Sequence, residues 1–325
     1  MSHVFFYDGT DITQVTNGAV FDTEVQTDGS NVFWIRQGGW SPDESEIYLW
    51  NGSTEQNLTN NSLNEQDTHI DANGNLVWMG GDTLDLNTFD IYQYDGLVIS
   101  RITENGFFEG RPYADGGKIA WAGGELPERN NIEIFMYDGD IHQISSDELY
   151  DDNPVMSGNR IAWESRDTDD ILVSDIYLYD AGDIQCLTDN TGHNIQPAIE
   201  GDLLAWESCD LSDPTYATCE IMLYDIGTET LSQITDDTLV DEHPVICEGA
   251  LFWWTHGADS YNNAKINLWF QGGVHAITSD SLPDYSSPAS CAGGTIGWMR
   301  LNSLQEQEIA FGSVECFKNC ETLKF

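Results

Sequence analysis

Short apolar segments alternate with polar turns along the whole chain, and one type of segment returns at a nearly constant interval. Each copy contains a tryptophan flanked by aliphatic or small residues, as at residues 32–35 and 161–163. Seven tryptophans mark the copies: Trp34, Trp78, Trp121, Trp163, Trp206, Trp253 and Trp298. Successive members are 42 to 47 residues apart. A fixed period of this length indicates a repeat architecture.

Each repeat contains more than the tryptophan segment. The first six copies are followed by a segment with alternating large side chains, such as residues 47–50 and 176–179. Turn pairs such as Asp95-Gly96 come next, and glycine favours a tight hairpin because it adopts positive φ readily. A third segment ends in a Leu/Ile-Thr step, and a fourth leads to the next tryptophan. The pattern predicts four short strands per repeat, and no segment shows a sustained helical period.

A four-stranded sheet cannot bury both of its faces alone, but sheets stacked side by side can. We therefore predict an all-β fold in which residues 1–325 form a single seven-bladed β-propeller of four-stranded antiparallel blades. Residues 4–8 and 12–16 also have strand patterns, although they precede the first tryptophan. We expect this N-terminal segment to complete the last blade and so close the ring with the C-terminal segment.

The order of residues within the repeat resembles that of the TolB-like propeller repeat. A proline and a glycine turn precede Ile-Ala-Trp, which is followed by Asp/Glu-Ile-Tyr-x-Tyr-Asp and Gln-x-Leu-Thr; residues 153–188 match best. Most TolB repeats have Ser-Pro-Asp-Gly at the turn, where this chain has Thr27-Asp28-Gly29 or Ser157-Gly158. The resemblance implies a propeller like those of periplasmic and surface proteins. It says little about function, because this fold carries scaffolds, lectin-like proteins and lyases.

The chain is strongly acidic. Eleven basic and 56 acidic residues give a formal net charge of −45. Nucleic acids and anionic membranes need a positive surface and are therefore excluded as partners. The acidity indicates either solubility in a salty habitat or a surface that collects cations or basic partners. No apolar run is long enough for a membrane-spanning helix, so we expect no membrane insertion.

Charged residues stand about ten positions before most of the repeat tryptophans, on the strand that should line the channel. The predicted acidic channel mouth comprises Asp22, Glu24, Asp67, Glu109, Arg111, Asp151, Asp152, Asp241, Glu242 and His243. Crowded carboxylates repel one another, and a hard cation such as Ca²⁺ relieves that repulsion. A solvated acidic rim and a calcium site both remain open, and we expect no other cofactor.

We predict a non-catalytic TolB-like propeller that is monomeric and binds a protein or peptide of basic character, or a cation, at the acidic mouth. A carbohydrate-binding propeller is the first alternative. The second is a polyuronate lyase, because some uronate lyases resemble this fold and use His, Tyr and Arg around the channel. His243, Arg111 and Tyr113 would serve here, but one arginine among many acids is a poor setting for a polyanionic substrate.

The cysteines suggest disulfides. Cys209 and Cys219 flank an insertion between two strands of the fifth repeat, so we expect them to pair. Cys316 and Cys320 are a second candidate pair. Disulfides persist in oxidising compartments, which favours a periplasmic or extracellular location.

Overall fold

The computed structural model describes residues 4–7, 12–17, 21–38, 45–126, 132–167, 173–188, 192–210, 219–257, 260–278, 295–301 and 307–313. These residues form strands, turns and bends, and none of them is helical. The described part of the chain accordingly contains no helix that could cross a membrane. The chain divides into two compact units, Met1–Pro154 and Val155–Phe325, which we describe separately.

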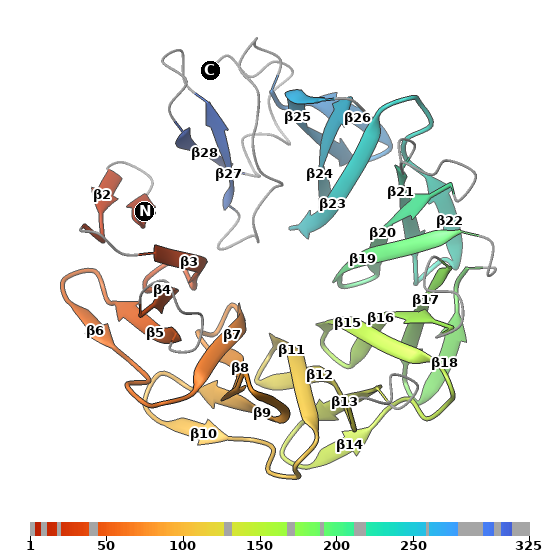
Figure 1. The fold of residues 1–325 in the computed structure, drawn as a ribbon. Coiled ribbons are helices and arrows are strands. Elements are labelled where there is room, and N and C mark those ends of the chain that lie inside the picture. The colour runs from red at the N-terminus through yellow and green to blue at the C-terminus, as the bar shows by residue number, and fades with distance from the viewer. Residues whose placement is uncertain are drawn as a thin grey trace. The chain divides into compact units, whose positions relative to one another are not determined.

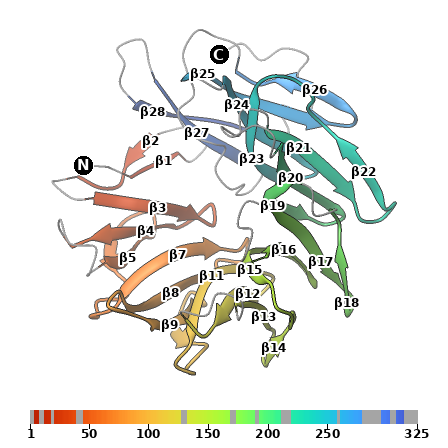
Figure 2. The ribbon, with the colours of Figure 1, turned by 45° about the vertical axis from the view of Figure 1, so that its right-hand side comes forward.

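Three four-stranded antiparallel sheets make up most of the first unit (Figure 1). The first sheet contains β3 (Phe21–Thr27), β4 (Val32–Gln37), β5 (Ser45–Trp50) and β6 (Glu55–Asn57). The second contains β7 (Asn64–Ile70), β8 (Leu76–Asp82), β9 (Asp85–Tyr94) and β10 (Ile99–Arg101). The third contains β11 (Phe108–Asp115), β12 (Lys118–Gly124), β13 (Glu133–Tyr137) and β14 (Ile141–Gln143). In each sheet the strands lie in chain order, as Figure 2 shows for β7, β8 and β9.

The second unit begins within β15 and repeats the same arrangement. One sheet contains β15 (Tyr150–Ser157), β16 (Arg160–Arg166), β17 (Ser174–Asp180) and β18 (Asp183–Cys186). The next contains β19 (His193–Glu200), β20 (Leu203–Cys209), β21 (Cys219–Asp225) and β22 (Thr230–Gln233), and a single parallel pair, Ser174–His193, joins the two sheets. The last complete sheet contains β23 (Val240–Cys247), β24 (Ala250–Gly257), β25 (Ser260–Phe270) and β26 (Gly273–Ala276).

The repeat tryptophans form the core, on the second strand of each sheet. Six of them are at most 1% exposed: Trp34, Trp78, Trp121, Trp163, Trp206 and Trp253. Four stack on a ring of the third strand; Trp121, for example, lies 5.8 Å from Phe135. Apolar side chains of one sheet also pack on the next, as Phe33 and Leu49 do against Trp78. This packing between sheets explains why the tryptophan period was the strongest signal in the sequence.

The Leu/Ile-Thr step has a structural role in the repeat. Thr103 Oγ1 accepts a hydrogen bond from the Ile91 amide (2.9 Å) and donates one to Asp90 Oδ1 (3.0 Å). Ser145 makes the same two bonds in the next sheet, to Ile134 and Glu133. Each hydroxyl thus ties the segment after the fourth strand to the backbone and an acidic side chain of the third strand. The Asp/Glu-Ile pattern of the sequence supplies the partners of this contact.

The all-β prediction and the four-stranded antiparallel sheets are confirmed, whereas seven blades and a closed ring are not. The predicted N-terminal strands exist, but β1 (Phe5–Tyr7) pairs with β2 (Ile12–Gln14) in a sheet of two strands. The strands of the seventh repeat, β27 (Thr295–Leu301) and β28 (Gln307–Ser313), likewise form a two-stranded sheet. Among the described strands, no pairing joins the N-terminal segment to the C-terminal one.

Candidate functional site

The first strand of each complete sheet carries one residue with a left-handed backbone. These residues have φ between 48° and 54°: Glu24, Asp67, Arg111, Asn153, Gln196 and His243. In five sheets the pairing with the second strand shifts register around this residue. Such a backbone is strained for a non-glycine residue, and strained positions of this kind cluster at functional sites. We call these six the bulge residues, and all of them are exposed or half-buried.

The residues two positions before the bulge are buried instead. Asp22, Glu109, Asp151 and Asp241 are at most 4% exposed, although the sequence placed them at the channel mouth. Asp241 accepts the indole N–H of Trp253 at 2.9 Å, and Glu109 accepts that of Trp121. Asp22 pairs with Arg36 at 2.7 Å. Burial raises the pKa of Glu109 to about 7 and raises that of Asp241. All four carboxyl groups are therefore buried rather than exposed at an open rim, and the contacts of Asp22, Glu109 and Asp241 are with an ion-pair partner or a repeat tryptophan.

In the first unit, the other predicted residues form a row of charges on successive sheets. Arg111 Nε lies 2.9 Å from Asp152 Oδ1, and Asp67 is close enough to interact electrostatically with both. Glu24 Oε2 accepts the Thr68 amide at 3.0 Å. Burial raises the pKa of Asp67, while Arg111 opposes that rise. The structure therefore combines four of the predicted mouth residues into one partly neutralised group.

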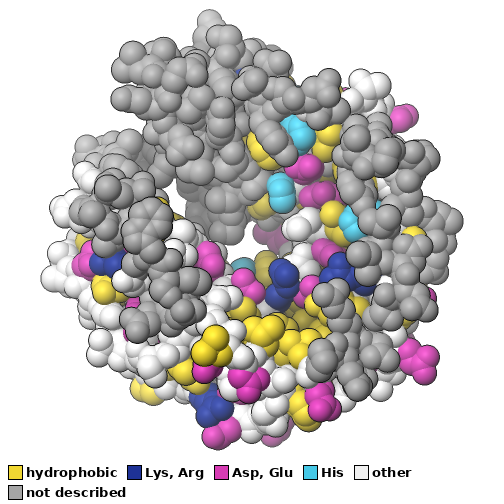
Figure 3. Space-filling view, in the orientation of Figure 1, with side chains coloured by type: hydrophobic (Ala, Val, Ile, Leu, Met, Phe, Trp, Pro, Cys, Tyr) yellow, Lys and Arg dark blue, Asp and Glu magenta, His cyan; other side chains and the backbone are white. Residues whose placement is uncertain are grey.

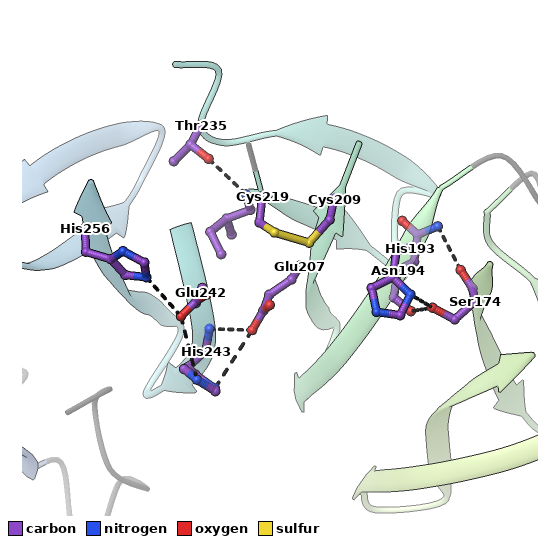
Figure 4. The surroundings of a disulfide bond; sticks show 11 residues. Ser174, His193, Asn194, Glu207, Cys209, Cys219, Thr235, Glu242, His243 and His256 are labelled. Carbon is purple, nitrogen blue, oxygen red and sulfur yellow. Dashed lines mark hydrogen bonds and ion pairs between the residues drawn. A yellow bond between two sulfur atoms is a disulfide. The ribbon is translucent and has the colours of Figure 1, made fainter. Parts of the chain in front are cut away.

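In the second unit, Glu242 and His243 belong to a cluster that also contains Glu207 and His256 (Figure 4). Glu242 Oε2 lies 3.3 Å from His256 Nε2 and 4.0 Å from His243 Nε2. His243 Nδ1 lies 3.9 Å from Glu207 Oε1. The Trp254 ring is 6.5 Å from the His243 ring and 5.1 Å from that of His256. Histidine and acidic side chains gather on this face of the unit (Figure 3).

Glu207 has the most unusual electrostatic environment of the cluster. It is 4% exposed, and its Oε1 accepts the His243 amide at 2.6 Å. Burial raises the pKa of Glu207 to about 8, and the nearby carboxylates of Glu242 and Glu164 add to the rise. Burial also lowers the pKa of His243, against the effect of Glu242. Near neutral pH the cluster therefore holds a protonated Glu207 beside a neutral His243, and it can exchange protons or bind a cation.

Sequence reasoning missed Glu164 and Glu207. Both directly follow a repeat tryptophan, and both accept the amide of the bulge residue on the next sheet. Glu164 Oε1 is 2.8 Å from the Gln196 amide. The available signal was the Trp-Glu pair, which occurs in only these two repeats.

A serine–histidine pair in the second unit is structural rather than nucleophilic. Ser174 Oγ lies 3.0 Å from His193 Nδ1, but it donates its hydrogen to the Asn194 carbonyl at 2.9 Å. Ser45 makes the equivalent bond to the Glu65 carbonyl in the first unit. A buried hydroxyl that repeats this contact joins neighbouring sheets, so Ser174 is not an activated nucleophile.

Three carboxyl groups, on β13, on β15 and in the segment before β15, have metal-like spacing. One oxygen each of Glu133, Asp147 and Asp151 lies within 4.8 Å of the others. Ser145 Oγ donates to Glu133 Oε2 at 2.7 Å, and the Asp147 amide donates to Glu133 Oε1 at 3.2 Å. Only Asp151 of this group belongs to the predicted channel mouth. Calcium binding stays a prediction.

The expected disulfide between Cys209 and Cys219 is present and joins the ends of β20 and β21. Cys316 and Cys320 lie outside the described residues. Cys247 is also disulfide-bonded, while Cys186 is a free thiol whose Sγ donates to the Thr188 carbonyl.

Replacing both Cys209 and Cys219 with serine is expected to lower the free energy of unfolding by about 2–3 kcal/mol. The bridge stabilises the fold because it reduces the conformational entropy of the unfolded chain. Chemical unfolding measures the change. A Cys186→Ser variant is the control, since it removes a thiol without removing a bridge. A double variant as stable as that control would contradict the expectation.

No protein-family model matches the sequence, and no curated protein matches it. Solved structures do. The β-propeller domain of the trilobed protease from Pyrococcus furiosus has a TM-score of 0.64 at 11% identity, over 91% of this chain and 95% of that one. The acylaminoacyl peptidase of Pyrococcus horikoshii has a TM-score of 0.64 at 13% identity, over 94% of this chain and 55% of that one. A puromycin-hydrolyzing peptidase of Mycobacterium tuberculosis has a TM-score of 0.65 at 11% identity, over 91% of this chain and 51% of that one.

This chain thus spans about half the length of the two complete peptidases. The similar propellers belong to peptidases, and this finding overturns the prediction of a non-catalytic scaffold together with its lectin-like and lyase alternatives. The comparisons do not single out TolB-like repeats. At these identities they establish the fold: the chain has the β-propeller fold of such peptidase domains.

Proposed function

We propose that this chain acts as the propeller domain of a peptidase. The observation that carries the proposal is the similarity of about nine-tenths of the chain to peptidase propellers, with TM-scores of 0.64 and 0.65. A separate catalytic domain would perform the hydrolysis. The described residues of this chain would contribute contacts to the peptide, which agrees with the structural role of Ser174.

We further propose that the substrates are peptides rich in lysine or arginine. A net charge of −45 attracts such peptides over long distances and accelerates their encounter with the protein. At short range, the carboxylate of Glu242 can pair with the charged head of a basic side chain. The half-buried position of Glu242 leaves one side open to solvent.

Peptide binding to the whole chain tests this site. A fluorescent peptide with several lysines should bind at least about tenfold more tightly than the same peptide with glutamates, and salt should weaken it strongly. Glu242→Gln should weaken binding of the basic peptide. Glu148→Gln, which removes an exposed carboxylate on a turn, should leave that binding unchanged. Equal affinities for the basic and acidic peptides would contradict the proposal.

Three finer features are also proposed. The seventh tryptophan repeat would be a seventh TolB-like blade that the N-terminal strands complete, although the trilobed-protease propeller is described as having an open velcro topology. A variant without residues 1–17 should then show faster hydrogen exchange in β27 and β28, and unchanged exchange would contradict closure.

The Cys209–Cys219 disulfide supports a periplasmic or extracellular location, and we propose that the chain is a monomer.

A further inference from the structure

The sequence contains the acceptor pattern of N-glycosylation, Asn-x-Ser or Asn-x-Thr with x other than proline, three times. The acceptor asparagines are Asn51, Asn57 and Asn60, so all three copies fall within residues 51–62 of a chain of 325 residues. No other asparagine of the sequence has a serine or threonine two positions later. Because so short a pattern also occurs by chance, it identifies a site only where the fold exposes the asparagine and the hydroxyl group.

All three copies lie along β6, which is an edge strand of the first sheet (Figure 1). Asn51 lies between β5 and β6, Asn57 is the last residue of β6, and Asn60 lies between β6 and β7. The fourth strand of every other complete sheet exposes one aliphatic side chain: Ile99, Ile141, Ile184, Leu231 or Val274. β6 has the sequence Glu-Gln-Asn instead. This edge is therefore polar and suits a large hydrophilic group.

Asn51 presents both groups that the pattern requires. It is exposed, as is Ser53. Asn51 Oδ1 accepts hydrogen bonds from the Ser53 amide at 3.2 Å and from the Ser53 hydroxyl at 2.9 Å. The amide and the hydroxyl thus lie together in one turn, and these bonds use the oxygen rather than Nδ2, the atom that would carry the sugar. A side chain at Gly52 would meet nothing within 4 Å, so the space around this turn is open.

The fold separates the other two copies. Asn60 is exposed, and so is the serine two positions later. Asn57 is half-buried, and its partner Thr59 accepts the Ile47 amide at 3.0 Å. The hydroxyl of this copy therefore belongs to the Leu/Ile-Thr contact of the repeat. Two of the three copies are available for modification, whereas the third has a structural role.

We propose that Asn51 and Asn60 are N-glycosylated. In this reaction Nδ2 of the asparagine forms a bond to the anomeric carbon of an oligosaccharide that is carried on a polyprenyl phosphate lipid. The bond from that carbon to the phosphate oxygen breaks, the lipid phosphate leaves, and one amide proton passes to a base of the transferase. The cell supplies the transferase and the lipid-linked donor.

N-glycosylation sites belong to surface loops of secreted proteins. The inference therefore rests on the proposed periplasmic or extracellular location, and it goes beyond the proposed peptidase role. An edge strand presents unpaired backbone N–H and C=O groups, to which a strand of another chain can add. Glycans at both ends of β6 would obstruct such an addition, so we expect them to keep this edge unpaired.

Mass spectrometry of the protein purified from its native source tests the inference. A protease that cleaves after aromatic residues and leucine releases residues 51–58 and 59–63 as separate peptides, so the two sites are measured independently. We expect each peptide to carry the mass of a glycan, with fragmentation locating it on Asn51 and Asn60. Unmodified Asn51 and Asn60 would overturn the inference. A Cys209–Cys219 disulfide in that same sample would show that the proposed location still stands.

Ser53→Ala is the decisive variant because it removes the acceptor hydroxyl and keeps the asparagine. Expressed in the native source, it should lose the glycan on residues 51–58 completely and keep the one on residues 59–63, and Asn51→Gln should do the same. Asn73→Gln is the matched control. Asn73 is an exposed turn residue in the sequence Asn-Gly-Asn, which lacks the hydroxyl, so this variant should keep both glycans. A Ser53→Ala protein that still carries a glycan on Asn51 would also overturn the inference.

Discussion

Replacing Trp121 with alanine is expected to lower the free energy of unfolding by about 3–5 kcal/mol. Trp121 is 1% exposed and stacks on Phe135 at 5.8 Å, so the substitution leaves a large cavity between sheets. It also removes the N–H donor of the buried Glu109. Chemical unfolding measures the loss.

The control for this variant is Leu84→Ala, at a residue that is 90% exposed on the β8–β9 turn. An exposed substitution of this kind should change stability by less than about 0.5 kcal/mol. If Trp121→Ala were as mild as Leu84→Ala, the tryptophan repeat would not be the core of the fold.

Glu207→Gln is expected to stabilise the protein at pH 8 by on the order of 4 kcal/mol, with little effect near pH 4.5. The unfolded chain releases the Glu207 proton near pH 4.5, whereas burial keeps it on the folded protein up to about pH 8. Between these values the folded state binds more protons, so this group's contribution to stability falls as the pH rises. Glutamine mimics the protonated carboxyl group and can still accept the His243 amide.

Unfolding free energies of the unmodified chain and of Glu207→Gln, measured from pH 4.5 to pH 8, test this expectation. The difference between the two proteins should grow steadily with pH. Glu148→Gln, at an exposed turn, should show no such growth. A constant difference for Glu207→Gln would mean that Glu207 is ionised in the folded protein throughout this range.

The sheets were predictable because their core depends on local pattern. A tryptophan about every 43 residues, followed by Asp/Glu-Ile and Leu/Ile-Thr, identifies the second and third strands through contacts that each repeat makes in the same way. The Cys209–Cys219 disulfide was predictable for a similar reason, since both cysteines flank one hairpin.

The candidate site was harder to predict because one bulge decides which side chains are buried. Asp241 and His243 are two residues apart, and regular alternation would place both on the same face. The left-handed backbone at His243 separates them, so Asp241 is 1% exposed while the His243 side chain is 43% exposed. Glu207 acquires its role from a residue of the next sheet, and the only local signal of that contact is the Trp-Glu pair that Glu164 shares.

The prediction of a non-catalytic scaffold was wrong because it was drawn from the repeat pattern alone. A repeat pattern identifies a fold that many unrelated proteins share, so it could not separate a scaffold from part of an enzyme. The similarity of nearly the whole chain to peptidase propellers contradicts the scaffold prediction and supports the proposed role in a peptidase.

Peptide hydrolysis by the protein that carries this chain in its native source tests the central proposal most directly. The protein would be captured with an antibody against the chain and incubated with fluorogenic blocked peptides. A peptidase should release the fluorophore, and a Glu242→Gln variant expressed in the same source should have a raised KM for lysine-rich substrates. Capture of the chain without any peptide hydrolysis would contradict its role as the propeller domain of a peptidase.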